Sequence, residues 1–93
     1  MPTIYSVLDL STAHLPEELR DDLNAEPGVI AHKLTYGWLM WVPTDPVEHA
    51  AETIDPMPAQ VLAVQRYAHS LGCQYVLFDR DADVSAELPT WHQ

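Results

Sequence analysis

Hydrophobic and polar positions alternate with two different periods along the chain, and the first half begins with a strand pattern. Thr3–Leu10 is rich in β-branched and aromatic residues, which is typical of a strand. Leucines then recur at every fourth position, at 15, 19 and 23, which predicts a helix over about 16–25 with Pro16 in its first turn. Val29–Leu34 and Trp38–Val42 are apolar runs joined by a short turn, and Gly37 suits a positive φ angle there, so this pair predicts a hairpin.

The second half has a proline-rich segment, a helix pattern and a last strand. Four prolines over 43–58 exclude a central strand, but Asp45-Pro46 with apolar residues at helical spacing predicts a short helix over 46–54. From Met57 to Leu71 apolar residues recur in steps of four and three, and Gly72 follows where a helix would end. Cys73–Phe78 is the last predicted strand.

This order of elements is strand, helix, strand, strand, helix, strand, which matches the ferredoxin-like βαββαβ plan of the α+β class. We therefore expect one domain over 1–93 with a four-stranded antiparallel sheet and the first and third strands in its centre. Both long helices would cover one face of the sheet, and the 46–54 helix would be an additional short element.

The other face of the predicted sheet also carries apolar residues. Side chains along a strand alternate between the two faces of the sheet, so Trp38 and Trp41 of the same strand point to opposite faces. Each face therefore carries a tryptophan. An exposed face of this kind predicts a homodimer that uses Trp38 or Trp41, or cover from the Trp91 tail and the short helix.

The chain of 93 residues has 14 acidic and four basic residues, which gives a formal net charge of −10. This balance argues against direct nucleic-acid binding and against binding to anionic membranes, because both need clustered lysine and arginine. No apolar run is long enough to span a bilayer, and the N-terminus lacks the features of a secretory signal. With a single cysteine, Cys73, the sequence predicts a cytoplasmic protein without disulfides or cofactors.

Acidic residues cluster at two places in the chain. The first cluster is in the predicted 16–25 helix and comprises Glu17, Glu18, Asp21 and Asp22. Carboxylates one helical turn apart lie about 5–6 Å from each other, so a row of them could imitate a phosphate backbone and bind a basic partner. The alternative is a solvated helix face that contributes only to solubility.

The second cluster follows the last strand and comprises Asp79, Asp81 and Asp83. It resembles the start of a calcium loop, but Val84 and Thr90 stand where such a loop needs glycine and glutamate. We therefore expect a tight acidic turn capped by its own aspartates, and include it with the first cluster as a partner-binding surface.

One group of polar residues could be drawn as a catalytic triad. Asp9, Ser11 and His14 lie together between the first strand and the first helix, but no nucleophile elbow or oxyanion loop accompanies them. Ser11 or Thr12 serves equally well as a cap. The five histidines lack paired ligand spacing, so no metal site is expected.

Four short motifs together resemble a known family. They are Ser11-Thr12-Ala13-His14-Leu15, Tyr36-Gly37-Trp38, Phe78-Asp79-Arg80-Asp81 and Leu88-Pro89-Thr90-Trp91. The resemblance is to a family of small bacterial proteins of unknown function that are frequently encoded on plasmids, integrative elements and prophages. It implies a mobile-element origin and no catalytic residues.

Three hypotheses of function follow. The first is a non-enzymatic acidic protein of a mobile element that inhibits a host defence protein, as an anti-CRISPR or anti-restriction factor, by occupying its basic nucleic-acid-binding surface. The second is a structural or regulatory homodimer that uses the exposed sheet face. The third is a small enzyme with Asp9, Ser11 and His14 at its site.

Overall fold

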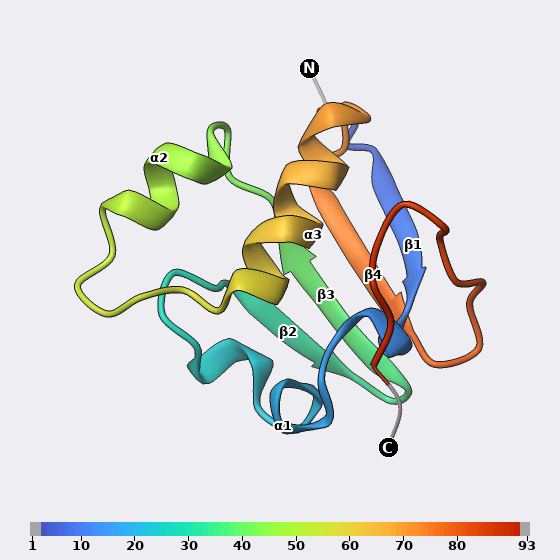
Figure 1. Ribbon diagram of the computed structural model, residues 1–93. Helices are drawn as coiled ribbons and strands as arrows, with labels where there is room; N and C mark the ends of the chain where they lie inside the picture. Colours follow the sequence, from blue (N-terminus) through green and yellow to red (C-terminus); the bar gives the residue numbers. More distant parts are fainter. Residues whose placement is uncertain (1–2, 92–93) are drawn as a thin grey trace.

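The computed structural model describes residues 3–91, which form a mixed α+β fold (Figure 1). Four strands form one sheet: β1 (Val7–Ser11), β2 (Ala31–Leu34), β3 (Gly37–Trp41) and β4 (Tyr75–Asp79). The α-helices are α1 (Glu17–Arg20), α2 (Pro46–Ala51) and α3 (Ala59–Ser70). Two 3₁₀ turns flank α1, namely η1 (Thr12–His14) and η2 (Leu23–Ala25).

The strand order in the sheet is β1-β4-β3-β2, and the sheet is mixed. β1 pairs with β4 in parallel, whereas β4 with β3 and β3 with β2 are antiparallel pairs. The prediction of a fully antiparallel sheet is therefore wrong, and so is the central position expected for the first strand, whereas the third strand is central as predicted. β4 and β3 are central, β1 is an edge strand, and the ferredoxin-like plan is not confirmed.

The proline-rich segment between β3 and α3 accounts for this difference. β3 ends and β4 begins at the same end of the sheet, with Trp41 opposite Tyr75. Between them the chain passes along the molecule twice, first through 43–58 and then back through α3 (Figure 1). A ferredoxin-like connection makes one such pass and returns a parallel strand. Because this chain makes two passes, β4 runs antiparallel to β3 and parallel to β1.

The helix predicted over about 16–25 is much shorter in the structure. α1 ends at Arg20, and Asp22 has a non-helical backbone with φ −148° and ψ 54°. The indole Nε1 of Trp38 donates to the carbonyl oxygen of Arg20 at 2.7 Å, where a continuing helix would place a backbone N–H. Adjacent aspartates are also poor helix formers. The expectation of two long helices on the sheet is wrong, because α3 is the one long helix in the part of the chain that the structure describes.

The helix predicted from Met57 to Leu71 is confirmed as α3, and it supplies the centre of the core. The chain leaves α3 through Gly72, whose φ of +76° is the left-handed conformation expected after a helix. The hairpin and the short helix near 46–54 are also confirmed, as β2–β3 and α2. The core joins α3 to one face of the sheet and to the leucines around α1; its largest fully buried apolar side chains are Phe78, Leu15, Leu23, Met40, Val61, Val64 and Val76.

Gly37 is required by close packing and not by its backbone angles. Among the described residues the glycines with positive φ are Gly28 and Gly72, so the positive φ expected at Gly37 is absent. A Cβ atom at Gly37 would collide with the carbonyl oxygen of Phe78. Glycine at this position therefore lets β3 approach β4.

Within residues 3–91, no helix covers one of the two faces of the sheet. α3, α1 and the 80–91 tail lie over the same face (Figure 1). On the opposite face Leu39 pairs with Leu77 in the central strands, and both are half-buried. Val7, Ile30 and Leu34 are each between 41% and 55% exposed near its edges. We call Val7, Ile30, Leu34, Leu39 and Leu77 the open sheet face.

Candidate functional site

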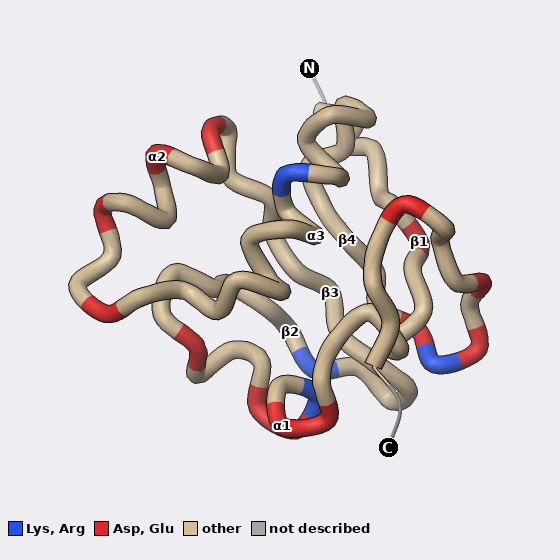
Figure 2. Tube along the Cα trace, in the orientation of Figure 1, with Lys and Arg blue, Asp and Glu red and all other residues tan. Residues whose placement is uncertain are grey.

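The first acidic cluster is exposed and continues along one edge of the molecule. Glu17 and Glu18 lie in α1, Asp21 and Asp22 follow it, and all four are exposed. Figure 2 shows further acidic positions along the outer edge from η2 through the 52–58 connection to α2. Glu26 follows η2, Asp45 and Glu48 lie at the start of α2, and Glu52 and Asp55 follow α2. We call these residues together with the first cluster the acidic rim: Glu17, Glu18, Asp21, Asp22, Glu26, Asp45, Glu48, Glu52 and Asp55. The sequence predicted only the α1 part, because the rest depends on the course of 43–58.

The second acidic cluster forms a self-capped turn. Oδ1 of Asp79 accepts a hydrogen bond from the backbone N–H of Asp81 at 2.9 Å, and the Asp79 carbonyl oxygen accepts one from Ala82 at 3.0 Å. The expected acidic turn is therefore confirmed. Residues 3–91 contain no group of three histidine, cysteine or acidic side chains placed to hold a metal ion.

The two acidic clusters do not form one surface. The turn that contains Asp81 and Asp83 lies across the molecule from the rim (Figure 2). Arg20, Lys33 and Arg80 line one pocket together, and this pocket also includes Asp21 at the end of the rim. Because cations lie beside Asp21, the structure separates the rim from Asp79, Asp81 and Asp83.

The residues of the hypothetical triad have other partners. The Ser11 hydroxyl accepts a hydrogen bond from the backbone N–H of Ala13 at 3.1 Å, which makes it the predicted cap. His14 is fully buried, and its Nε2 accepts the backbone N–H of Ser85 at 2.9 Å. The neutral ring therefore carries its proton on Nδ1, which donates to the carbonyl oxygen of Pro89 at 2.9 Å. Both ring nitrogens form hydrogen bonds to the backbone of the 80–91 tail, so His14 is not free to act as a base for Ser11.

Asp9 also lies apart from this arrangement. It is exposed on β1 and alternates with the buried Leu10, so its side chain lies on the sheet face opposite to the core. Asp9, Ser11 and His14 are near one another in sequence, but the structure does not assemble them into a catalytic group.

The two tryptophans proposed for the sheet face have different positions. Trp38 is only 3% exposed and belongs to the core, so its assignment to an exposed interface is wrong. Its indole also donates to Arg20, as described above. Trp41 is half-buried at the end of β3, where its ring meets the ring of His49 edge to face at 5.4 Å.

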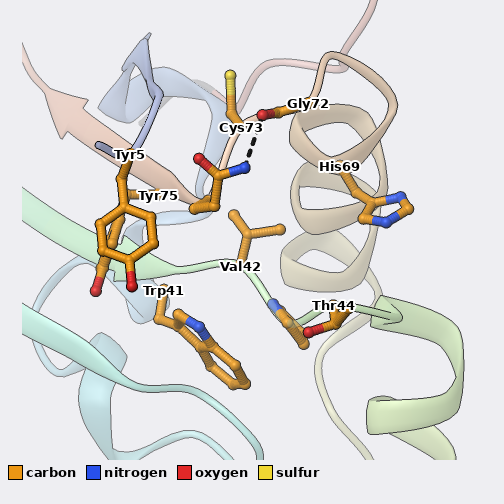
Figure 3. Close-up of a pocket in the computed structure, with 10 residues that line it drawn as sticks. Tyr5, Trp41, Val42, Thr44, His69, Gly72, Cys73 and Tyr75 are labelled. Atoms are coloured by element: carbon orange, nitrogen blue, oxygen red, sulfur yellow. Dashed lines mark hydrogen bonds between the residues drawn. The ribbon is translucent and has the colours of Figure 1, made fainter. Parts of the chain in front are cut away.

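A pocket of about 380 Å³ at the start of β4 was missed by the sequence analysis. Figure 3 shows Tyr5, Trp41 and Tyr75 around it. His69, in the last turn of α3, and Cys73, which follows the helix, also line it. The Tyr5 and Tyr75 rings meet edge to face at 5.5 Å. These tyrosines are neighbours because β1 and β4 are parallel, whereas the predicted antiparallel sheet would place them at opposite ends.

Comparison with known proteins assigns the chain to a family. A family model described as the C-terminal domain of a family of unknown function, DUF5983, matches residues 7–93. The chain belongs to this family. No curated protein and no solved structure matches it. Within residues 3–91, none of the helices of this DUF5983 domain has the length and apolar character needed to cross a membrane.

The four sequence motifs meet at one end of the sheet in this DUF5983 domain. The Trp91 N–H donates to the Ala13 carbonyl oxygen at 2.7 Å, which joins the last motif to the first. The Arg80 N–H donates to the Tyr36 carbonyl oxygen at 3.2 Å, which joins the other two. The motifs therefore have a shared structural role in holding the 80–91 tail and the β2–β3 turn together.

Proposed function

We propose that this protein is a non-enzymatic binding protein of a mobile element that inhibits a host defence protein, as an anti-CRISPR or anti-restriction factor. In this proposal the acidic rim occupies a basic surface by which the host protein binds nucleic acid. The observation that supports it is the concentration of exposed carboxylates along one edge, from α2 to α1.

The electrostatics of the rim suit such a partner. A protein surface that binds nucleic acid presents clustered lysine and arginine to phosphates, and a row of carboxylates offers the same sign of charge. Complementary charge of this kind accelerates encounter and excludes partners of the wrong sign. The rim carries most of the negative charge of the chain, whereas the 79–83 turn lies beyond the cations, so the proposal now rests on the rim.

The test compares two charge-reversed double variants. Asp21→Lys with Asp22→Lys reverses the charge within the rim, and Asp81→Lys with Asp83→Lys makes the same change in net charge at the turn. In a bacterium with an active CRISPR or restriction system, we expect the rim variant to lose protection of phage or plasmid and the turn variant to retain it. Full protection by the rim variant refutes the proposal, and equal loss in both shows that only net charge matters.

A homodimer formed through the open sheet face is the second candidate, and the uncovered apolar residues of that face favour it. Its centre is half-buried Leu39 beside Leu77, and Ile30 at its edge is 55% exposed. A second copy packed on this face would bury these side chains, just as the helices bury the apolar side chains of the opposite face.

Light scattering after size-exclusion chromatography tests the dimer. Ile30→Glu places a charge on the open sheet face, and Ile54→Glu places the same charge at a fully exposed site beyond α2. We expect a dimer for the natural sequence and for Ile54→Glu, and a monomer for Ile30→Glu. A monomeric natural protein at high concentration contradicts this candidate.

A further inference from the structure

The few cations of this chain gather at one place. Of its four basic residues, Arg20, Lys33 and Arg80 line the same pocket beside the β2–β3 turn. Arg66 is exposed in α3 and is not part of the pocket lining. Asp21 is the one acidic residue in the pocket lining, so positive charge prevails there although the chain as a whole is strongly negative. A pocket in which positive charge prevails attracts an anionic ligand.

The Arg20 guanidinium is held in place by the backbone. Its Nε donates to the Leu15 carbonyl oxygen at 2.7 Å, and its Nη2 donates to the Trp91 carbonyl oxygen at 2.9 Å. A guanidinium has five N–H donors, so these two bonds fix its orientation and leave three donors for a ligand.

The other two cations are positioned by aromatic rings. The Lys33 ammonium lies over the Trp38 ring at 4.9 Å from its centroid, and the Arg80 guanidinium lies over the Tyr36 ring at 4.4 Å. Both are contacts in the range of cation–π interactions. The hydrogen bond from Arg80 to Tyr36 and the close approach of β3 to β4 at Gly37 keep these rings and cations together.

We propose that this pocket binds the phosphate group of a small phosphorylated molecule. A phosphate offers two negative charges and several acceptor oxygens, which match three cations and the hydroxyl groups of Thr12, Thr35 and Tyr36. The pocket has a volume of about 210 Å³. Pockets that enclose drug-sized ligands have volumes of about 300–1,000 Å³, so this pocket is too small to enclose a whole molecule of that size. The phosphate is therefore the group that the pocket recognises, and the remainder of the molecule extends outward.

The first measurement is a titration of the ¹⁵N-labelled protein, followed by the Trp38 indole and the Tyr36 and Arg80 amide resonances. The probes are inorganic phosphate and adenosine 5′-monophosphate, at an ionic strength held constant with sodium chloride, and acetate serves as a carboxylate comparison. We expect saturable shifts at these resonances with both phosphates. Tighter binding of the nucleotide identifies an organic phosphate as the source, and equal binding identifies free phosphate. No saturable shift with phosphate, or equally tight binding of acetate, overturns the proposal.

Three charge-neutralising variants locate the site. Arg80→Gln and Lys33→Gln each remove one cation of the pocket, and Arg66→Gln removes the cation outside it. We expect phosphate affinity to fall about tenfold in each pocket variant, which corresponds to one lost charged contact, and to stay unchanged in Arg66→Gln. Equal affinity in all three variants contradicts the site. Arg20 is not substituted because it also holds the tail.

Discussion

At the scale of single residues, Gln65 is fully buried in α3, and neither its amide nitrogen nor its amide oxygen has a hydrogen-bond partner. A buried polar group without a partner costs about 1–3 kcal/mol. Methionine has a similar length and helix propensity but carries no such group. We therefore expect Gln65→Met to raise the free energy of unfolding in urea by about 1–3 kcal/mol. The control is Gln60→Met at a half-exposed site in α3, where we expect no change; a less stable Gln65→Met protein contradicts the prediction.

His14 leads to the opposite prediction, because its ring satisfies two backbone groups of the tail. His14→Leu removes the partners of the Ser85 N–H and the Pro89 carbonyl oxygen. We expect the free energy of unfolding to fall by about 2–4 kcal/mol, since two polar groups lose their bonds. Hydrogen exchange should also accelerate at Ser85 and Trp91 before it does in α3. The control is His69→Leu, because His69 is exposed. If hydrogen exchange in the 80–91 tail of His14→Leu is unchanged, the role assigned to the His14 ring is contradicted.

At the scale of elements, Gly37 and Gly72 are needed for different physical reasons, which substitution by alanine separates. In Gly37→Ala the added Cβ meets the Phe78 carbonyl oxygen, so β3 and β4 must separate, and we expect a loss of about 3 kcal/mol. In Gly72→Ala the Cβ meets no atom, and the cost is the left-handed backbone alone, about 1–2 kcal/mol. Thermal unfolding of both variants measures the difference, and a smaller loss in Gly37→Ala contradicts the steric argument.

Elements with a local cause were predictable from the sequence, and their arrangement was not. The apolar spacing from Met57 to Leu71 specifies α3 whatever surrounds it, and the turn before Gly37 specifies the hairpin. α1 is short partly because the indole of Trp38, which is distant in sequence, donates a hydrogen bond to the Arg20 carbonyl oxygen. No local pattern around α1 predicts this contact. The position of β4 depends on the path of 43–58 across the molecule, and no local pattern encodes that path.

The candidate sites follow the same division. The exposure of Glu17, Glu18, Asp21 and Asp22 was predictable, because they are charged residues beside a leucine stripe. The pocket of Arg20, Lys33 and Arg80 was not, because these residues lie far apart in the chain. The pairing of β3 with β2 and β4 brings Lys33 and Arg80 together, and the hydrogen bond from the Trp38 indole to the Arg20 carbonyl oxygen adds Arg20.

At the scale of the whole molecule, a net charge of −10 on a fold with a radius of gyration of 12.5 Å predicts a stability that depends on salt. Repulsion between carboxylates disfavours the compact state, and salt screens it because the Debye length falls to about 8 Å at 0.15 M and about 3 Å at 1 M. We expect the melting temperature to rise with sodium chloride, most steeply at low concentration.

The acidic rim should account for much of this dependence, and neutralising part of it tests that. Glu17 and Asp21 are one helical turn apart, and such a like-charge pair costs about 0.2–0.5 kcal/mol. The double variant Asp21→Asn with Asp22→Asn should be more stable than the natural sequence at low salt and should gain less from added salt. Asp81→Asn with Asp83→Asn is the matched control; it should keep a steeper dependence, because its turn lies apart from the rim (Figure 2). If salt instead lowers the stability of the natural sequence, attraction between the rim and the cations beside Asp21 outweighs the repulsion within the rim, and the rim is then less available to a basic partner.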